Sequence, residues 1–280
     1  MKTIKKIFLM TDLEGVAGVL DSPNWCLWDG KYYDQAKEFL TLEVNAAADA
    51  LFAGGAEDIL VSDSHGPGAI NPGLIDPRVR LTRGSPNGWP LELDRSFDAL
   101  VFVGQHAKAE TPGAHLCHTQ NMGYIDLSVN GKSIGEFGQL AMCASELGVR
   151  TIFGSGDSAF TREARALVPW IETVGVKRGL RKGRGEELND RQYRLHNAGA
   201  VHVPPKRSRD MIHDGALRAI TRANKEKFGL IRMKPPYTRV AIFRPTEGIP
   251  YKRISRETHR KSFIGLLNMA FNPRPLQKGA

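Results

Sequence analysis

The chain has 280 residues, of which 41% are hydrophobic and 25% charged, an ordinary composition for a globular protein that excludes a disordered or collagen-like chain. The apolar run after MKTIKK is too short for a signal-peptide core or a membrane span, so we expect a cytoplasmic protein with no membrane partner. The three cysteines, Cys26, Cys117 and Cys143, show no CxxC spacing and predict free thiols rather than disulfides or a zinc knuckle.

The net charge of +9 is distributed unevenly along the chain. Residues 1–176 carry 14 Lys and Arg against 22 Asp and Glu, a net charge of −8, whereas residues 177–280 carry 25 against 8, a net charge of +17. We therefore expect a main α/β domain over 1–176 and a smaller, basic α+β part over 177–280. The run KRGLRKGR at 177–184 has no interleaved aromatic residues, so it is interpreted as a solvated loop or interface strip, without a nucleic-acid partner. A nucleic-acid-binding protein that uses the basic part is the alternative.

Strands and helices are predicted to alternate. Residues 4–10 form an apolar strand, and 34–52 have helical spacing that ends at two glycines. The segments DILVSDSHG, FDALVFVGQH and VRTIFGSGD each contain a further short strand. Before the last of these, Asn130-Gly131 between alternating apolar residues predicts a β-hairpin, and Glu136 to Leu147 is expected to be a helix. The pattern predicts an α/β fold with a mostly parallel layered sheet flanked by helices and a β-hairpin insertion.

Polar residues follow the ends of the predicted strands. They are Asp12 and Glu14 after the first strand, Asp63 and His65 after the second, His106 after the third, and Glu136 where the hairpin returns to a helix. Residues two positions apart point to the same side of an extended chain, so Asp12 and Glu14 are expected to share one small volume. Because the carboxyl ends of parallel strands meet at one edge of a sheet, we expect the other side chains to join them there.

Such a cluster predicts bound metal. Carboxylates brought together without a cation repel one another, and at least one would have to bind a proton. A divalent metal removes that cost, and carboxylates with imidazoles suit zinc. Each residue alone could instead be an ordinary capping or loop residue. Together, three carboxylates and two imidazoles exceed what one tetrahedral zinc ion needs, so the sequence favours two metals that share a carboxylate.

Five motifs, TDLEGVAG, SDSHG, GQHAKAETPG, CHT and GEFG, resemble in order and spacing those of the D-aminopeptidase family of dizinc metallopeptidases first associated with a dipeptide-transport operon. The resemblance covers about residues 5–175 and fades after about residue 200, where 245–269 keep only the layout of a short strand and a closing helix. It implies two zinc ions per subunit and a catalytic histidine at His118. The metal ligands that it implies are Asp12, Glu14, His65, His106 and Glu136.

The same resemblance implies what the protein does. It implies metal-assisted hydrolysis that releases an N-terminal residue, D-configured, from short peptides, with His118 as proton carrier or nucleophile. It also implies a homo-oligomeric ring, which in the family is a decamer of two stacked pentamers.

Alternatives remain for the catalytic residue and for the reaction. His115 lies three residues before His118, which is preferred because Thr119 follows it as in the family motif. Cys117 is not expected to be a thiol nucleophile, because adjacent residues of an extended chain point apart. The rival reaction is that of a haloacid-dehalogenase-like, magnesium-dependent phosphatase, since DLEG and FGSGDSAFT resemble its loops. A phosphatase of that type would need an acidic residue where Thr161 stands, and it would give the histidines no role.

Overall fold

The computed structural model describes residues 3–277. Its first eleven elements are β1 (Lys6–Thr11), α1 (Ser22–Trp25), α2 (Tyr33–Ala53), β2 (Asp58–Asp63), β3 (Arg80–Arg83), β4 (Ala99–Gln105), β5 (Tyr124–Val129), β6 (Lys132–Ser133), α3 (Glu136–Leu147), β7 (Arg150–Asp157) and α4 (Ser158–Leu167). The remaining elements are β8 (Glu172–Gly179), α5 (Asp190–His196), β9 (Ala200–His202), α6 (Pro205–Ala223), β10 (Tyr237–Phe243), β11 (Arg253–His259), α7 (Phe263–Leu267) and β12 (Arg274–Pro275). No helix within 3–277 is long and apolar enough to cross a membrane.

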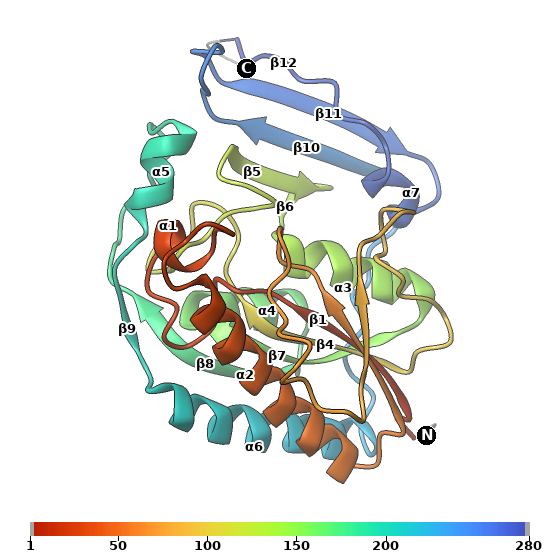
Figure 1. The fold of residues 1–280 in the computed structure, drawn as a ribbon. Coiled ribbons are helices and arrows are strands. Elements are labelled where there is room, and N and C mark those ends of the chain that lie inside the picture. The colour runs from red at the N-terminus through yellow and green to blue at the C-terminus, as the bar shows by residue number, and fades with distance from the viewer. Residues whose placement is uncertain (1–2, 278–280) are drawn as a thin grey trace.

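A seven-stranded sheet in the order β3-β2-β1-β4-β7-β8-β9 forms the centre of the molecule (Figure 1). Its neighbouring strands are parallel except for β8 and β9, which are antiparallel. Side chains of β1 alternate between the two faces, and each face has its own apolar core. Ile7 and Leu9 pack in the core with α2 and α6, whereas Phe8 and Met10 pack in the core with α3 and α4. Burial on both faces explains why β1 and β4 read as continuous apolar runs.

A second, antiparallel sheet has the order β12-β11-β10-β5-β6. It lies on the α3 side of the seven-stranded sheet (Figure 1). The predicted hairpin forms its edge, with the β5–β6 turn at Asn130 (φ +50°) and Gly131 (φ +79°). Both φ angles lie in the left-handed region, as both central residues of a two-residue type I′ hairpin turn require. Since β5 also pairs with β10, the hairpin joins the N-terminal half of the chain to strands from its C-terminal end.

The predicted fold class is confirmed, and α3 has the bounds expected from the sequence. The interpretation of 177–184 as a solvated loop is wrong at its start, because Lys177 to Gly179 end β8 and Lys177 is buried. The proposed domain boundary at residue 176 therefore falls within β8, and α6 packs against α2 beyond it. The division into two parts stays a prediction.

Candidate metal centre

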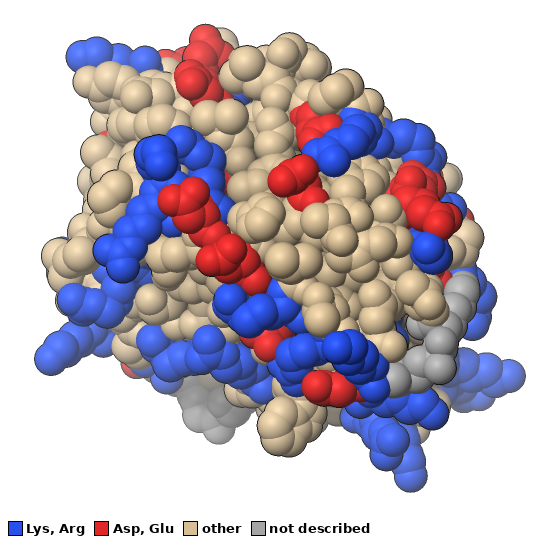
Figure 2. Space-filling model, turned by 90° about the horizontal axis from the view of Figure 1, so that it is seen from below, with Lys and Arg blue, Asp and Glu red and all other residues tan. Residues whose placement is uncertain are grey.

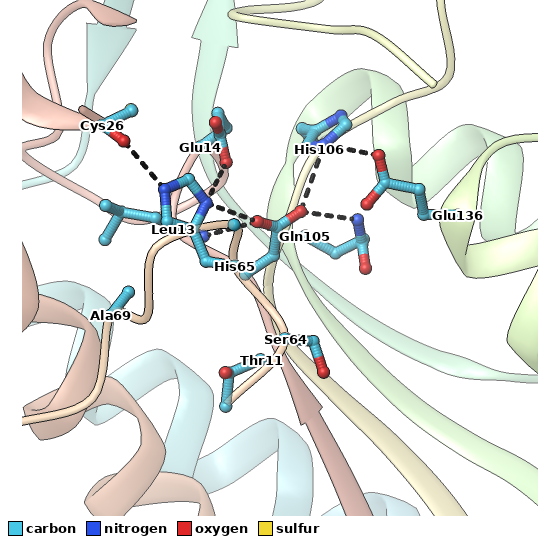
Figure 3. Close-up of polar contacts among 12 residues, drawn as sticks. Thr11, Leu13, Glu14, Cys26, Ser64, His65, Ala69, Gln105, His106 and Glu136 are labelled. Atoms are coloured by element: carbon cyan, nitrogen blue, oxygen red, sulfur yellow. Dashed lines mark hydrogen bonds and ion pairs between the residues drawn. The ribbon is translucent and has the colours of Figure 1, made fainter. Parts of the chain in front are cut away.

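Six side chains that the sequence singles out lie at the carboxyl edge of the parallel sheet, in two groups. Asp12 and Glu14 follow β1, His65 follows β2, His106 follows β4, His118 lies in the loop before β5, and Glu136 begins α3. One group is Asp12, Glu14 and His65, and the other is His106, His118 and Glu136; within each group, one donor atom per residue lies within 4.8 Å of the others. Figure 3 shows His65 directed at Glu14, and His106 at Glu136, with the members of each pair coming from separate elements.

The DLEG turn owes its shape to close packing against β4. The Gly15 amide donates to the Gly104 carbonyl oxygen over 2.7 Å, and a Cβ atom at Gly15 would lie only 2.2 Å from the Gln105 carbonyl oxygen. Only glycine permits this approach. Leu13 is fully buried in the apolar core, which leaves Asp12 and Glu14 on the same side, at 4% and 5% exposure.

Asp12 lies between the two groups and directs one carboxylate oxygen to each. Its Oδ1 is 3.3 Å from His65 Nδ1, and its Oδ2 is 3.1 Å from His106 Nε2. The Leu13 amide donates to Oδ1 over 2.8 Å, and the Gln105 side-chain amide donates to Oδ2 over 3.1 Å. These bonds hold the carboxylate plane, and two oxygens facing different imidazoles form the arrangement that a bridging carboxylate needs.

Backbone carbonyl oxygens orient the three imidazoles. They belong to Cys26 for His65 Nε2 (2.9 Å), Ala107 for His106 Nδ1 (2.8 Å) and Leu116 for His118 Nδ1 (2.9 Å). A carbonyl oxygen can only accept, so in each ring the nitrogen facing it carries the proton. The opposite nitrogen, Nδ1 of His65 and Nε2 of the other two, faces the carboxylates and is the atom that could bind a metal in the neutral ring.

Charges in the cluster strongly perturb one another. Burial alone would raise the pKa of Asp12, but the adjacent His106 and His65 hold it well below its usual range. Burial alone would lower the pKa of His65 and of His106, but the carboxylates of Glu14 and Asp12 raise both well above their usual range. Burial also raises the pKa of Glu136 to about 7. Without metal, the cluster is thus balanced by protons on imidazole, which a divalent cation would replace.

Two buried atoms of the cluster make no hydrogen bond. They are Glu14 Oε2, which lies 3.1 Å from His65 Nδ1, and His106 Nε2. Buried polar atoms without a hydrogen bond are uncommon and costly in proteins. Metal ions held among these carboxylate oxygens and imidazole nitrogens would satisfy both atoms, and this donor set suits zinc. The residues present therefore fit a pair of zinc ions.

His118, a member of the second group, lies at the cavity wall. Its ring stacks on His106 with centroids 4.1 Å apart, and its Nε2 is 3.8 Å from Glu136 Oε1. Burial, and then the nearby His106, lower the pKa of His118 to about 4, so its ring is neutral at neutral pH and able to accept a proton. His115 instead faces away, with its Nε2 bonded to the carbonyl oxygens of Leu20 and Ala198.

The cluster forms the floor of a cavity of about 580 Å³. Asp12, Glu14, His65, His118 and Glu136 line it, together with residues that the sequence did not single out, among them Arg83, Gln120 and Arg194. Gln105, whose amide holds Asp12, was also missed, although its place directly before His106 at the end of β4 could have indicated it. Asp63 stays outside the two groups, because its Oδ1 accepts from the Ala69 amide over 2.8 Å.

The segment FGSGDSAFT, which suggested a phosphatase, has another role in the structure. Asp157 caps α4 by accepting from the Phe160 amide, and its other oxygen accepts from the His115 amide over 2.9 Å. The carboxylate is fully buried and does not line the cavity. Both its oxygens are thus engaged by backbone amides, and the magnesium-phosphatase alternative gains no support.

Comparisons with known proteins agree on one family. A family model described as D-aminopeptidase matches residues 5–248. A D-aminopeptidase of Bacillus subtilis (strain 168) is 29% identical over 181 residues, which are 62% of this chain and 64%, just under two thirds, of that protein. A solved structure of the Zn-dependent D-aminopeptidase DppA from Bacillus subtilis, described as a self-compartmentalizing protease, matches with a TM-score of 0.74 and 22% identity over 85% of this chain and 81% of that one.

Proposed function

This chain belongs to the D-aminopeptidase family, and we propose that it is a zinc-dependent aminopeptidase that releases a D-configured N-terminal residue from short peptides. The observation that carries the proposal is the position of Asp12, whose two oxygens face imidazoles of two different groups. The zinc dependence printed for the structural neighbour supports the choice of metal.

Two zinc ions per subunit are proposed. Asp12, Glu14 and His65 would hold one, His106 and Glu136 the other, and Asp12 would be shared. When bound, zinc supplies Lewis acidity that polarises the scissile carbonyl and makes a water molecule a stronger nucleophile. This chemistry does not require a nucleophilic side chain, and the three cysteines, all buried, are not assigned a role.

Proton transfer is assigned to His118. Its Nδ1–H is fixed by the Leu116 carbonyl oxygen, so Nε2 is the atom that can accept a proton at the cavity wall. Its Nε2 can therefore act as a general base that later returns the proton to the leaving amine. Gln105 has a positioning role, since its amide fixes the Asp12 oxygen that faces His106. Action of His118 as the nucleophile itself is the alternative for this residue.

A homo-oligomer is also proposed, with the decameric ring of the family resemblance as its form. The self-compartmentalizing character of the structural neighbour supports it, as does the charge difference between residues 1–176 and 177–280. Figure 2 shows acidic side chains interspersed with basic ones over the middle of the face seen from below, and mostly basic side chains along its lower and left rim. On α6, for example, Arg222 pairs with Glu172 and Glu226. An active monomer at micromolar concentration, found by native mass spectrometry, would exclude the ring.

A substrate panel tests the proposed reaction. D- and L-alanyl peptides and amides, N-acetylated D-alanyl peptides and a phosphate monoester are incubated with the purified, zinc-supplemented protein. Release of D-alanine from peptides with a free N-terminus, and none from the acetylated forms, is expected. Cleavage of L-alanyl peptides alone would contradict the D-specificity, and phosphate release without amide cleavage would favour the phosphatase.

A further inference from the structure

The cavity above the metal centre has two arginines in its wall, and they differ in how far their donors are used. Arg83 donates from Nη1 to the carbonyl oxygens of Asp63 and His65, each over 2.9 Å, and from Nη2 over a short distance to that of Gly66. Its guanidinium thus holds the loop that carries His65. Three of its five N–H donors are thus directed at backbone carbonyl oxygens, which fixes the plane of the guanidinium.

Arg194 makes a single hydrogen bond, from Nη1 to Ser22 Oγ over 3.3 Å. Within residues 3–277, no carboxylate oxygen lies within 4.0 Å of its guanidinium nitrogens. The side chain lines the same cavity as Glu14, His118 and Glu136. The cavity therefore combines a carboxylate-rich metal end with one cationic side chain whose donors remain free for an anion.

Helix α5 holds Arg194 in place through its neighbour Tyr193. Tyr193 is buried, its hydroxyl accepts from the Glu110 amide over 2.7 Å, and the Arg244 guanidinium lies 3.7 Å from its ring centroid. Arg244 in turn pairs with the Glu110 carboxylate over 2.8 Å. The helix starts with a capping box between Asn189 and its third residue. A fixed backbone lowers the entropy that the arginine loses when it binds a ligand.

We propose that Arg194 binds the C-terminal carboxylate of the peptide substrate and thereby selects short peptides with a free C-terminus. The inference rests on the proposed function, because it assigns the far end of the same substrate. Guanidinium and carboxylate form paired, charge-assisted hydrogen bonds, which are stronger than neutral ones. A short peptide held at its scissile carbonyl by the metal centre presents one anionic group, its C-terminal carboxylate. Of the two arginines in the described cavity wall, Arg194 has the larger number of free donors, four of five, to receive it. A cavity of about 580 Å³ matches a ligand of that size.

The test compares D-alanylglycine with D-alanylglycinamide, which differ only in the terminal charge. The wild-type protein with zinc is expected to cleave the acid with a higher kcat/KM than the amide, by about tenfold to a hundredfold, the range for a hydrogen bond to a charged group. Arg194→Gln is expected to raise KM for the acid by a similar factor, to leave kcat nearly unchanged, and to have little effect on the amide. Arg194→Lys should restore part of the preference.

Arg191→Gln is the matched control, because Arg191 lies on the same helix, is 82% exposed in its side chain and, among residues 3–277, forms an ion pair only with Glu247. It should behave as the wild type with both substrates. Equal loss for acid and amide in Arg194→Gln would show a merely structural role and overturn the inference, as would equal cleavage of the two substrates by the wild type, which is measured without any variant. No cleavage of either substrate by the wild type would instead overturn the proposed function, and the inference with it.

Discussion

Two buried polar clusters lie on either side of the loop that carries His115 and His118, and they balance their charges differently. The metal centre described above has no lysine or arginine among its six members. The second, which we call the lysine cluster, consists of the buried Glu43, His115, Asp157 and Lys177 and the half-buried His202. Its own cation is Lys177, whose Nζ donates to the Val19 carbonyl oxygen over 3.2 Å. A buried acidic cluster that has histidines but no lysine or arginine therefore points to a metal.

The lysine cluster serves the turn that follows Glu14. Glu43 accepts from the Ala17 amide, His202 Nδ1 accepts from the Gly18 amide, and Lys177 donates at Val19. These bonds hold the chain directly after DLEG. The lysine cluster thus fixes the backbone of the site, whereas the metal centre directs carboxylate oxygens and imidazole nitrogens toward the positions of ions and substrate. Substitutions in the metal centre should affect catalysis, and substitutions in the lysine cluster should affect stability.

The largest effect is expected from Asp12→Ala, which removes the carboxylate that faces both histidine groups. Zinc and activity should be lost together, and the loss of activity should exceed the about 10²- to 10⁴-fold that removal of a proton-transfer group causes. Folding should survive, because the two apolar cores are untouched. Zinc content, peptide cleavage and circular dichroism are measured on the same sample.

Asp63→Asn is the matched control for this change. Asp63 is another strand-end carboxylate at the cavity wall, but its oxygen bonds the Ala69 amide rather than facing the histidines. The variant should keep its zinc. If it lost zinc as fully as Asp12→Ala does, the selection of ligands at this edge would be wrong.

The next largest effect separates the two histidines of the loop between the clusters. His118→Ala should keep zinc and lose about 10² to 10⁴ in turnover, because general acid–base catalysis contributes this much. His115→Ala should keep most of its activity and unfold at a lower temperature, because the carbonyl oxygens of Leu20 and Ala198 lose their donor. Cleavage rates and thermal melting of both variants measure the difference. A fully active His118→Ala beside an inactive His115→Ala would place the catalytic histidine three residues earlier.

The smallest effect concerns pH and stability in the lysine cluster. Burial raises the pKa of Glu43 from 4.5 to about 7, so the folded protein binds this proton more tightly than the unfolded chain. The resulting stabilisation is present below pH 4.5 and is lost as the pH rises to about 7. Glu43→Gln cannot ionise, so its melting temperature relative to the wild type should rise between pH 5 and pH 7.5. A difference that stays constant with pH would show that Glu43 does not titrate in this range.

Most of the candidate metal centre was predictable from the sequence, because Asp12, Glu14, His65 and His106 follow short apolar strands, whose carboxyl ends must meet in a parallel sheet. The two-residue spacing in DLEG indicated the shared side of Asp12 and Glu14, and Gly15 marked the close packing against β4. The His65 tautomer could not be predicted, because the carbonyl oxygen that sets it belongs to Cys26 in a distant segment. The His106 tautomer is set by the neighbouring Ala107 carbonyl oxygen, whose direction depends on the local backbone conformation. The assignment of these residues as ligands stays a prediction.

The C-terminal part was harder to predict, because its charged residues have roles that depend on distant contacts. Lys177 stands in a run of basic residues that resembles a solvated loop, yet it is buried at the end of β8 among carboxylates far away in the sequence. Arg244 is likewise buried, paired with Glu110. Neither pairing is visible as a local pattern in the sequence. Arg194 was missed for the same reason, since only folding brings α5 beside Ser22.

Zinc content and activity measured together on one preparation test the central claim most directly. The protein is stripped with a chelator, zinc is added back in steps, and bound zinc per chain is compared with the rate of D-alanyl peptide cleavage at each step. If two zinc ions share Asp12, we expect no activity without zinc and activity that rises until two ions per chain are bound. Full activity in the metal-free preparation would contradict the metal centre, and full activity at one ion per chain would contradict the pair that shares Asp12.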